Sequence, residues 1–124
     1  MKRLILFLSV IFFLFIPLTA YGNTEVTLRV GLVSNVNKVG FSVVAGEYIL
    51  TDASTQMPIG YPQKGEEWVV LREGLSMKIA IDGMIIETPY LGPLLLIPQD
   101  TSKDNIFRCL GVSYRDSLVI QNDT

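Results

Sequence analysis

The sequence predicts an all-β domain of short antiparallel strands, arranged as a sandwich or barrel and preceded by a signal-peptide helix. After residue 22, no segment keeps the 3.6-residue apolar period of an amphipathic helix. Short runs rich in β-branched residues recur instead, separated by Gly, Pro, Asn and Asp. Turn residues are also regularly spaced, because glycines fall nine residues apart at positions 65, 74, 83 and 92, as in all-β folds.

Residues 1–22 have the three parts of a secretory signal peptide. Basic residues stand at positions 2 and 3, a predominantly apolar stretch spans 4–16, and the small residues Ala20 and Gly22 frame a cleavage site. This apolar stretch is shorter than the ~20 residues that a membrane-spanning helix needs. We therefore predict export to the periplasm, cell wall or medium. Cleavage after Gly22, or after Ala20, is favoured over retention as a membrane anchor.

The segment 23–124 is predicted to be one domain with a mild negative charge. The whole sequence holds ten basic and twelve acidic residues, and Lys2 and Arg3 lie in the leader, so 10 − 2 = 8 basic residues remain against twelve acidic ones, a net charge of −4. About 100 residues suffice for a single hydrophobic core. Binding to nucleic acid or anionic lipid needs a concentrated positive field, so neither is predicted as a partner. Contact with a membrane is expected only through the leader, and only if the leader is not cleaved.

About nine or ten short strands are expected from these patterns. The clearest are at 26–33, 41–44, 48–51, 68–72, 77–81, 84–86, 94–97, 112–114 and 118–120.

Three connections can be predicted in more detail. Segments 41–44 and 48–51 are expected to form a hairpin around Ala45-Gly46-Glu47. Asp82-Gly83 favours a two-residue type I′ turn, because both residues tolerate positive φ. The segment 94–97 is apolar at every position, which predicts a strand covered on both faces.

The sequence offers few groups for catalysis. It contains no histidine, so serine-histidine triads, cysteine-histidine dyads and histidine-bound zinc are excluded. Cys109 is the only cysteine, so no disulfide forms within the chain, and we expect a small buried apolar residue rather than a nucleophile. Glu66 and Glu67 are adjacent and should point to opposite faces of a strand, so they cannot act together on one glycosidic bond. Both are expected to be solvated at a strand entrance.

The remaining polar and aromatic candidates have simple structural explanations. Asp52, Asp100 and Asp104 do not follow the calcium-loop pattern, and 100–105 is expected to be a polar surface loop. Aromatic side chains could stack on sugar rings, although such residues usually belong to the core of a β domain; they are Tyr48, Tyr61, Trp68, Tyr90 and Tyr114. Phosphate loops and dinucleotide motifs are absent from the sequence. No metal and no cofactor is therefore predicted.

Several segments, in this order, are similar to a known domain: Leu-Arg-Val-Gly-Leu at 28–32, Phe-Ser-Val-Val-Ala-Gly-Glu-Tyr at 41–48, Gly-Glu-Glu-Trp-Val-Val at 65–70, Gly-Pro-Leu at 92–94 and Tyr-Arg-Asp-Ser-Leu-Val-Ile at 114–120. Together they resemble the N-terminal part of the SpoIID/LytB domain of stage II sporulation protein D and amidase enhancers. The last segment is the most telling, because the family usually reads Tyr-Arg-Gly there. Asp116 replaces that glycine, and since Asp tolerates a left-handed backbone, we expect the turn to persist.

The resemblance implies a role at bacterial peptidoglycan. Sporulation members resemble lytic transglycosylases, and amidase enhancers are associated with stimulating a cell-wall amidase. In the cutting members the essential acid is a glutamate downstream of Tyr-Arg-Gly, whereas here no glutamate follows Glu87. The resemblance therefore implies a chain that is not catalytic by itself: the front of a longer protein, a split or shortened reading frame, or a stand-alone accessory domain. The implied partners are peptidoglycan, a wall hydrolase or the remainder of the same protein.

Tyr114, Arg115 and Trp68 are the candidates to face a glycan or a partner, although a role for Arg115 in anchoring its turn through backbone carbonyls is the simpler interpretation. The alternative hypothesis is a structural or protein-binding module of the envelope that is unrelated to this family. Such a module would hold another protein through strand edges or exposed aromatic residues. Unpaired edge strands would also favour association.

Overall fold

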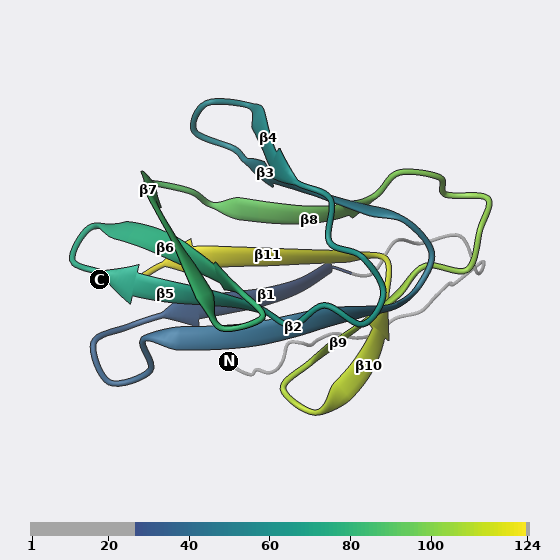
Figure 1. Cartoon of the computed structure of the whole chain (residues 1–124), viewed down its shortest axis with the longest axis horizontal. Coiled ribbons are helices and arrows are strands. Elements are labelled where there is room, and N and C mark those ends of the chain that lie inside the picture. The colour runs from purple at the N-terminus through teal and green to yellow at the C-terminus, as the bar shows by residue number, and fades with distance from the viewer. Residues whose placement is uncertain (1–26, 124) are drawn as a thin grey trace, which may run out of the picture.

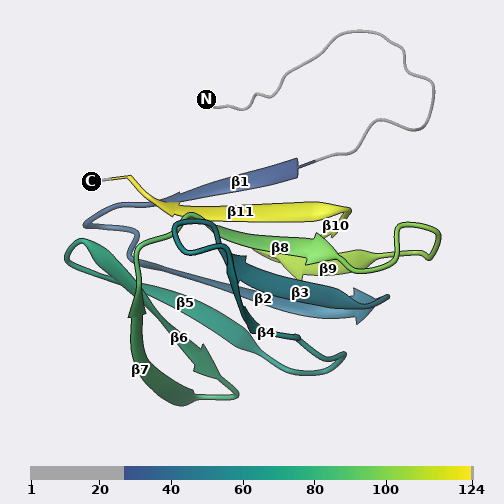
Figure 2. The same ribbon diagram turned by 90° about the horizontal axis from the view of Figure 1, so that it is seen from above.

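Two β-sheets pack face to face and make up the part of the chain that the computed structural model describes, residues 27–123 (Figures 1 and 2). Neither a helix nor a segment long and apolar enough to cross a membrane as a helix occurs among these residues. The all-β prediction is therefore confirmed for them. The predicted signal peptide at 1–22 lies outside the described residues.

The strands in chain order are β1 Thr27–Leu32, β2 Lys38–Ala45, β3 Tyr48–Asp52, β4 Met57–Gly60, β5 Trp68–Glu73, β6 Ser76–Ile81, β7 Met84–Tyr90, β8 Leu94–Pro98, β9 Ile106–Cys109, β10 Val112–Arg115 and β11 Ser117–Asn122. One sheet has the order β1-β11-β8-β3-β4, and the other has the order β10-β9-β2-β5-β6-β7. Neighbouring strands are antiparallel except β1 and β11, the first and last strands, which run parallel.

The core lies between the sheets because alternate residues of each strand face inward. In the five-stranded sheet, Leu50 pairs with Leu96, which pairs with Leu118, and all three are fully buried. The six-stranded sheet contributes the larger rings. Phe41 stacks on Trp68 with ring centroids 6.1 Å apart, and Phe107 meets the edge of the Tyr48 ring at 6.0 Å.

The predicted hairpin of 41–44 with 48–51 is wrong. β2 lies between β9 and β5 in one sheet, while β3 lies between β8 and β4 in the other. The chain crosses from sheet to sheet at Gly46, which has a φ of 87°. Both strands still present apolar residues to the core, but from opposite sides. The prediction failed because a local turn signal does not specify which sheet the next strand joins.

The prediction that 94–97 is covered on both faces is also wrong. Leu94 and Leu96 are fully buried, whereas Leu95 is half-buried and Ile97 is 38% exposed. Only the inner face of β8 is covered, and its outer face carries the other two apolar residues to the surface of the sheet. The apolar composition of 94–97 therefore led to a prediction of more burial than the strand has.

Two strands were not predicted from the sequence, β4 and β9. β4 contains Pro58, which weakens a strand signal and is tolerated here because β4 is an edge strand. β9 alternates Phe107 and Cys109, both buried, with the exposed Arg108. By contrast, the type I′ turn at Asp82-Gly83 is confirmed, with φ angles of 50° and 83°.

Candidate functional site

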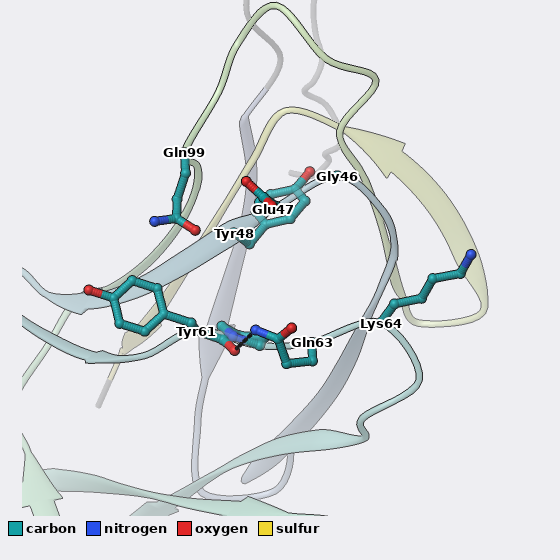
Figure 3. Close-up of a pocket in the computed structure, with 8 residues that line it drawn as sticks. Gly46, Glu47, Tyr48, Tyr61, Gln63, Lys64 and Gln99 are labelled. Carbon is teal, nitrogen blue, oxygen red and sulfur yellow. Dashed lines mark hydrogen bonds between the residues drawn. The ribbon is translucent and has the colours of Figure 1, made fainter.

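A pocket of about 380 Å³ lies where three connections meet at one end of the sheets (Figure 3). The connections are the crossing between β2 and β3, the loop between β4 and β5, and the residue that follows β8. Its lining residues are Gly46, Glu47, Tyr48, Tyr61, Pro62, Gln63, Lys64 and Gln99. The pocket lining thus combines two tyrosine side chains with two amides and one charge of each sign.

Backbone contacts fix the wall formed by the crossing. The N–H of Gln99 donates to the carbonyl of Glu47 at 2.8 Å, which ties the end of β8 to the start of β3. Tyr48 is 1% exposed, and burial raises the pKa of its hydroxyl, with Asp116 adding to the effect. Tyr48 therefore belongs to the core beneath the pocket, and its phenol is protonated at neutral pH.

Tyr61 forms the opposite wall and is 50% exposed. The side-chain amide of Gln63 donates to the carbonyl of Tyr61 at 2.8 Å, so the Gln63 amide group has a fixed orientation beside the ring. Figure 3 shows Tyr61 and Gln63 coming from the same loop, with Gln99 on the facing segment. The ring of Tyr61 is therefore accessible, and polar groups flank it.

Glu66 organises the loop that carries these residues. Its Oε1 accepts hydrogen bonds from the backbone N–H of Gln63 at 2.8 Å and from the indole Nε1–H of Trp68 at 3.1 Å. The N–H of Glu66 donates in return to the carbonyl of Gln63 at 3.0 Å. Glu67 is exposed, as expected, but Glu66 is half-buried and is a structural part of the pocket loop.

Replacing Glu66 with alanine should leave the indole N–H of the buried Trp68 without its acceptor. We expect the free energy of unfolding to fall by about 1–3 kcal/mol, the usual penalty for a buried donor that loses its partner. Glu66→Gln, which keeps an oxygen acceptor, should lose less than half as much in urea unfolding. Equal losses in the two variants would show that the carboxylate does not hold this loop through hydrogen bonds.

The three residues predicted to face a glycan or a partner do not meet in one place. Trp68 is 3% exposed and stacks on Phe41, so its ring lies in the core and presents no face to a ligand. Tyr114 is half-buried; its ring stacks on Phe107 at 5.6 Å, and burial raises its pKa. Arg115 is exposed, and its Nη1 donates to the Asp104 carboxylate at 2.6 Å, not to a backbone carbonyl.

The tyrosines named from the sequence separate clearly by exposure. Tyr90 is half-buried against the core, whereas Tyr61 alone of the five aromatic candidates is exposed. Its exposure results from the loop that follows β4, a strand that the sequence did not predict. The adjacent Pro62 and the polar residues that follow are the signal that could have placed Tyr61 in a loop.

The candidate acidic residues already have partners within the domain. Asp52 is 3% exposed and accepts hydrogen bonds from the N–H and hydroxyl of Ser54, at 3.1 and 2.8 Å, and from the N–H of Gly92 at 3.1 Å. Asp100 accepts from the N–H and hydroxyl of Ser102, and these bonds lower the pKa of the Asp100 carboxyl. Among residues 27–123, no three His, Cys, Asp or Glu side chains gather as metal ligands.

Cys109 is 2% exposed, which confirms its placement as a small buried residue. Burial raises the pKa of its thiol to about 11, so the group carries no thiolate near neutral pH.

Comparison with known proteins yields no relative: no protein family, no curated protein and no solved structure matches this chain significantly.

Proposed function

We propose that this chain is an exported domain of bacterial cell-wall remodelling or sporulation, similar to the N-terminal part of the SpoIID/LytB domain, and that it binds peptidoglycan without cutting it. The composition of the pocket carries this proposal. The exposed ring of Tyr61 offers an apolar face, and the amides of Gln63 and Gln99 offer donors and acceptors beside it. This pairing suits a sugar ring, which has apolar C–H faces and a rim of hydroxyl groups.

The distribution of carboxylates favours holding a glycan over cleaving it. Glycosidases place two carboxyl groups on either side of the bond, one as acid and the other as base or nucleophile. Glu47 is the one carboxylate among residues 27–123 that lines this pocket. Glu66, which lies in the same loop as Tyr61, already accepts two hydrogen bonds that maintain the loop.

Two features of the chain agree with the cell-wall assignment. The leader at 1–22 would deliver the domain to the envelope, where peptidoglycan or a wall hydrolase would be its partner. Asp116, which stands in place of the family's glycine, has a φ of 77°, the left-handed conformation expected for that turn. Both support the proposal independently of the pocket.

Replacing Tyr61 with alanine should weaken binding to purified sacculi. The ring is exposed and its loop is held by Glu66, so the variant should keep its unfolding midpoint while its affinity falls about tenfold, the effect of losing one stacking contact worth about 1–1.5 kcal/mol. Co-sedimentation with sacculi gives the bound fraction. Leu75→Ala is the matched control, because Leu75 is 80% exposed and lies in the β5–β6 turn. Unchanged binding by the Tyr61 variant would contradict the role of the pocket.

A further inference from the structure

The edge of the six-stranded sheet at β10 is open on one side among residues 27–123. Within this range β10 pairs only with β9, through Val112 with Cys109 and Tyr114 with Phe107. Since Val112 and Cys109 close a two-residue hairpin, the backbone N–H and C=O groups of the alternate residues, Ser113 and Arg115, point to the open side. Of the edge strands among the described residues, β4 and β7 contain Pro58 and Pro89, which hinder pairing with another chain, whereas β1 and β10 contain no proline.

The turn between β9 and β10 holds an apolar residue in an unfavourable conformation. Leu110 and Gly111 have φ angles of 55° and 78°, those of a type I′ turn, where asparagine usually precedes glycine. Leu110 is 66% exposed, and the neighbouring Val112 is 50% exposed. Neither the backbone strain nor the exposed apolar surface stabilises the isolated domain, and strained residues are concentrated where proteins bind ligands.

Positive charge lies on the outer face beside this edge. Arg108 is exposed on β9 and is paired across the sheet with Ser42 of β2 and Ser113 of β10. These short neighbours leave its guanidinium space to reach the edge, and no ion pair or hydrogen bond joins its side chain to another residue between 27 and 123. Arg115 lies on the same face as Ser113 and forms an ion pair with Asp104. Both side chains of this pair are exposed, so solvent weakens the attraction between them.

We propose that β10 accepts an extended acidic segment of a protein partner as an additional strand of the six-stranded sheet. Backbone hydrogen bonds to Ser113 and Arg115 would hold the segment, and its carboxylates would bind the guanidinium groups of Arg108 and Arg115. An apolar side chain of the partner would cover Leu110. This site uses none of the residues that line the pocket, so it adds a protein-binding surface to the proposed cell-wall function.

Charge complementarity favours an acidic partner over a second copy of this chain. If β10 paired with β10 of another copy, the alternate residues at the junction would again be Ser113 and Arg115, and β10 itself, Val-Ser-Tyr-Arg, would bring no carboxylate to Arg108. A separate acidic segment supplies what this edge lacks.

Peptide titrations followed by amide NMR test the proposal on the purified protein. The probes are three N-acetylated octapeptides in which threonine alternates with glutamate, glutamine or lysine. The glutamate peptide should shift the amides of Ser113 and Arg115 and bind about tenfold more tightly than the lysine peptide, because each reversed charge removes an attraction to arginine. Arg108→Glu should abolish this preference, and Arg29→Glu, on the edge strand β1, should leave it unchanged.

Two variants separate a binding role from a structural one. Ser113→Pro removes an N–H that points to the open side, so it should block peptide binding while β10 stays paired with β9. Leu110→Asn suits the turn better, so it should raise the unfolding midpoint and yet weaken peptide binding.

Each of three results would overturn the proposal: equal binding of the three peptides, shifts at β1 instead of β10, or concentration-dependent shifts at Ser113 without peptide, which would assign the edge to a second copy. Sacculus binding is a separate measurement and does not depend on the outcome.

Discussion

Replacing Gly46 with alanine is expected to lower the free energy of unfolding by about 2–4 kcal/mol, from a left-handed backbone penalty and a steric conflict together. Gly46 has a φ of 87°, and a Cβ there would collide with Oδ1 of Asn105 and lie 2.8 Å from the carbonyl oxygen of Asp104. Asn105 is 5% exposed and donates to the carbonyls of Asp100 and Lys103, at 2.8 and 3.0 Å. It cannot move aside without losing these bonds.

Gly65→Ala is the matched control for this variant. Gly65 has a φ of 92°, close to that of Gly46, but a Cβ there would meet nothing within 4 Å. This control should therefore show only the backbone penalty of about 1–2 kcal/mol. Urea unfolding of both variants measures the difference. Equal losses would mean that the close approach of Gly46 to Asn105 does not constrain the crossing between the sheets.

Replacing Asp52 with alanine should have a comparably large effect, a loss of about 3 kcal/mol, because a buried charged acceptor of three hydrogen bonds disappears. Oδ1 of Asp52 accepts hydrogen bonds from the N–H and the hydroxyl of Ser54 and from the N–H of Gly92. Asp52 therefore connects the end of β3 to the segment before β8. The backbone N–H groups of Ser54 and Gly92 would then lack acceptors inside the domain.

Asp52→Asn keeps an oxygen at the same place and serves as its control. It should lose about 1 kcal/mol, since the acceptor remains but its charge does not. Thermal or urea unfolding of the two variants gives the comparison. An alanine variant as stable as the unaltered protein would show that these three hydrogen bonds do not hold β3 and β8 together.

Most strand positions could be predicted from the sequence because the inner and outer faces of most strands differ in polarity. The alternation of Leu28 and Val30 with more polar residues placed β1, and Asp82-Gly83 placed the turn between β6 and β7. The positive φ at Asp116 was expected through the resemblance, because the family has a glycine there and Asp tolerates a left-handed backbone. In each case the information is local to a few residues.

Sheet membership could not be predicted in the same way. A turn at Ala45-Gly46-Glu47 suits a hairpin or a crossing between sheets equally well, and the choice depends on β9 and β8, which follow about fifty residues later. β9 itself was missed, because a strand of four residues with the charged Arg108 carries little pattern. The sheet that each strand joins therefore depends on pairing between distant segments, which local sequence signals do not specify.

The candidate site was the least predictable part. Trp68 was a candidate to face a glycan or a partner, yet its ring packs in the core. Tyr61 is exposed because it lies in a loop whose geometry depends on the carboxylate of Glu66. No spacing in the sequence shows that Gln99 lies across from Tyr61, because the pocket forms only when three connections meet. The sequence shows the chemistry of each side chain, but it does not show which side chains come together in the fold.

Incubating the purified protein with sacculi and analysing both the pellet and the supernatant tests the central claim most directly. If the domain holds peptidoglycan without cleaving it, the protein should sediment with the sacculi and the supernatant should contain no released glycan fragments by mass spectrometry. Protein that stays entirely in the supernatant, or glycan fragments that accumulate with time, would contradict the claim.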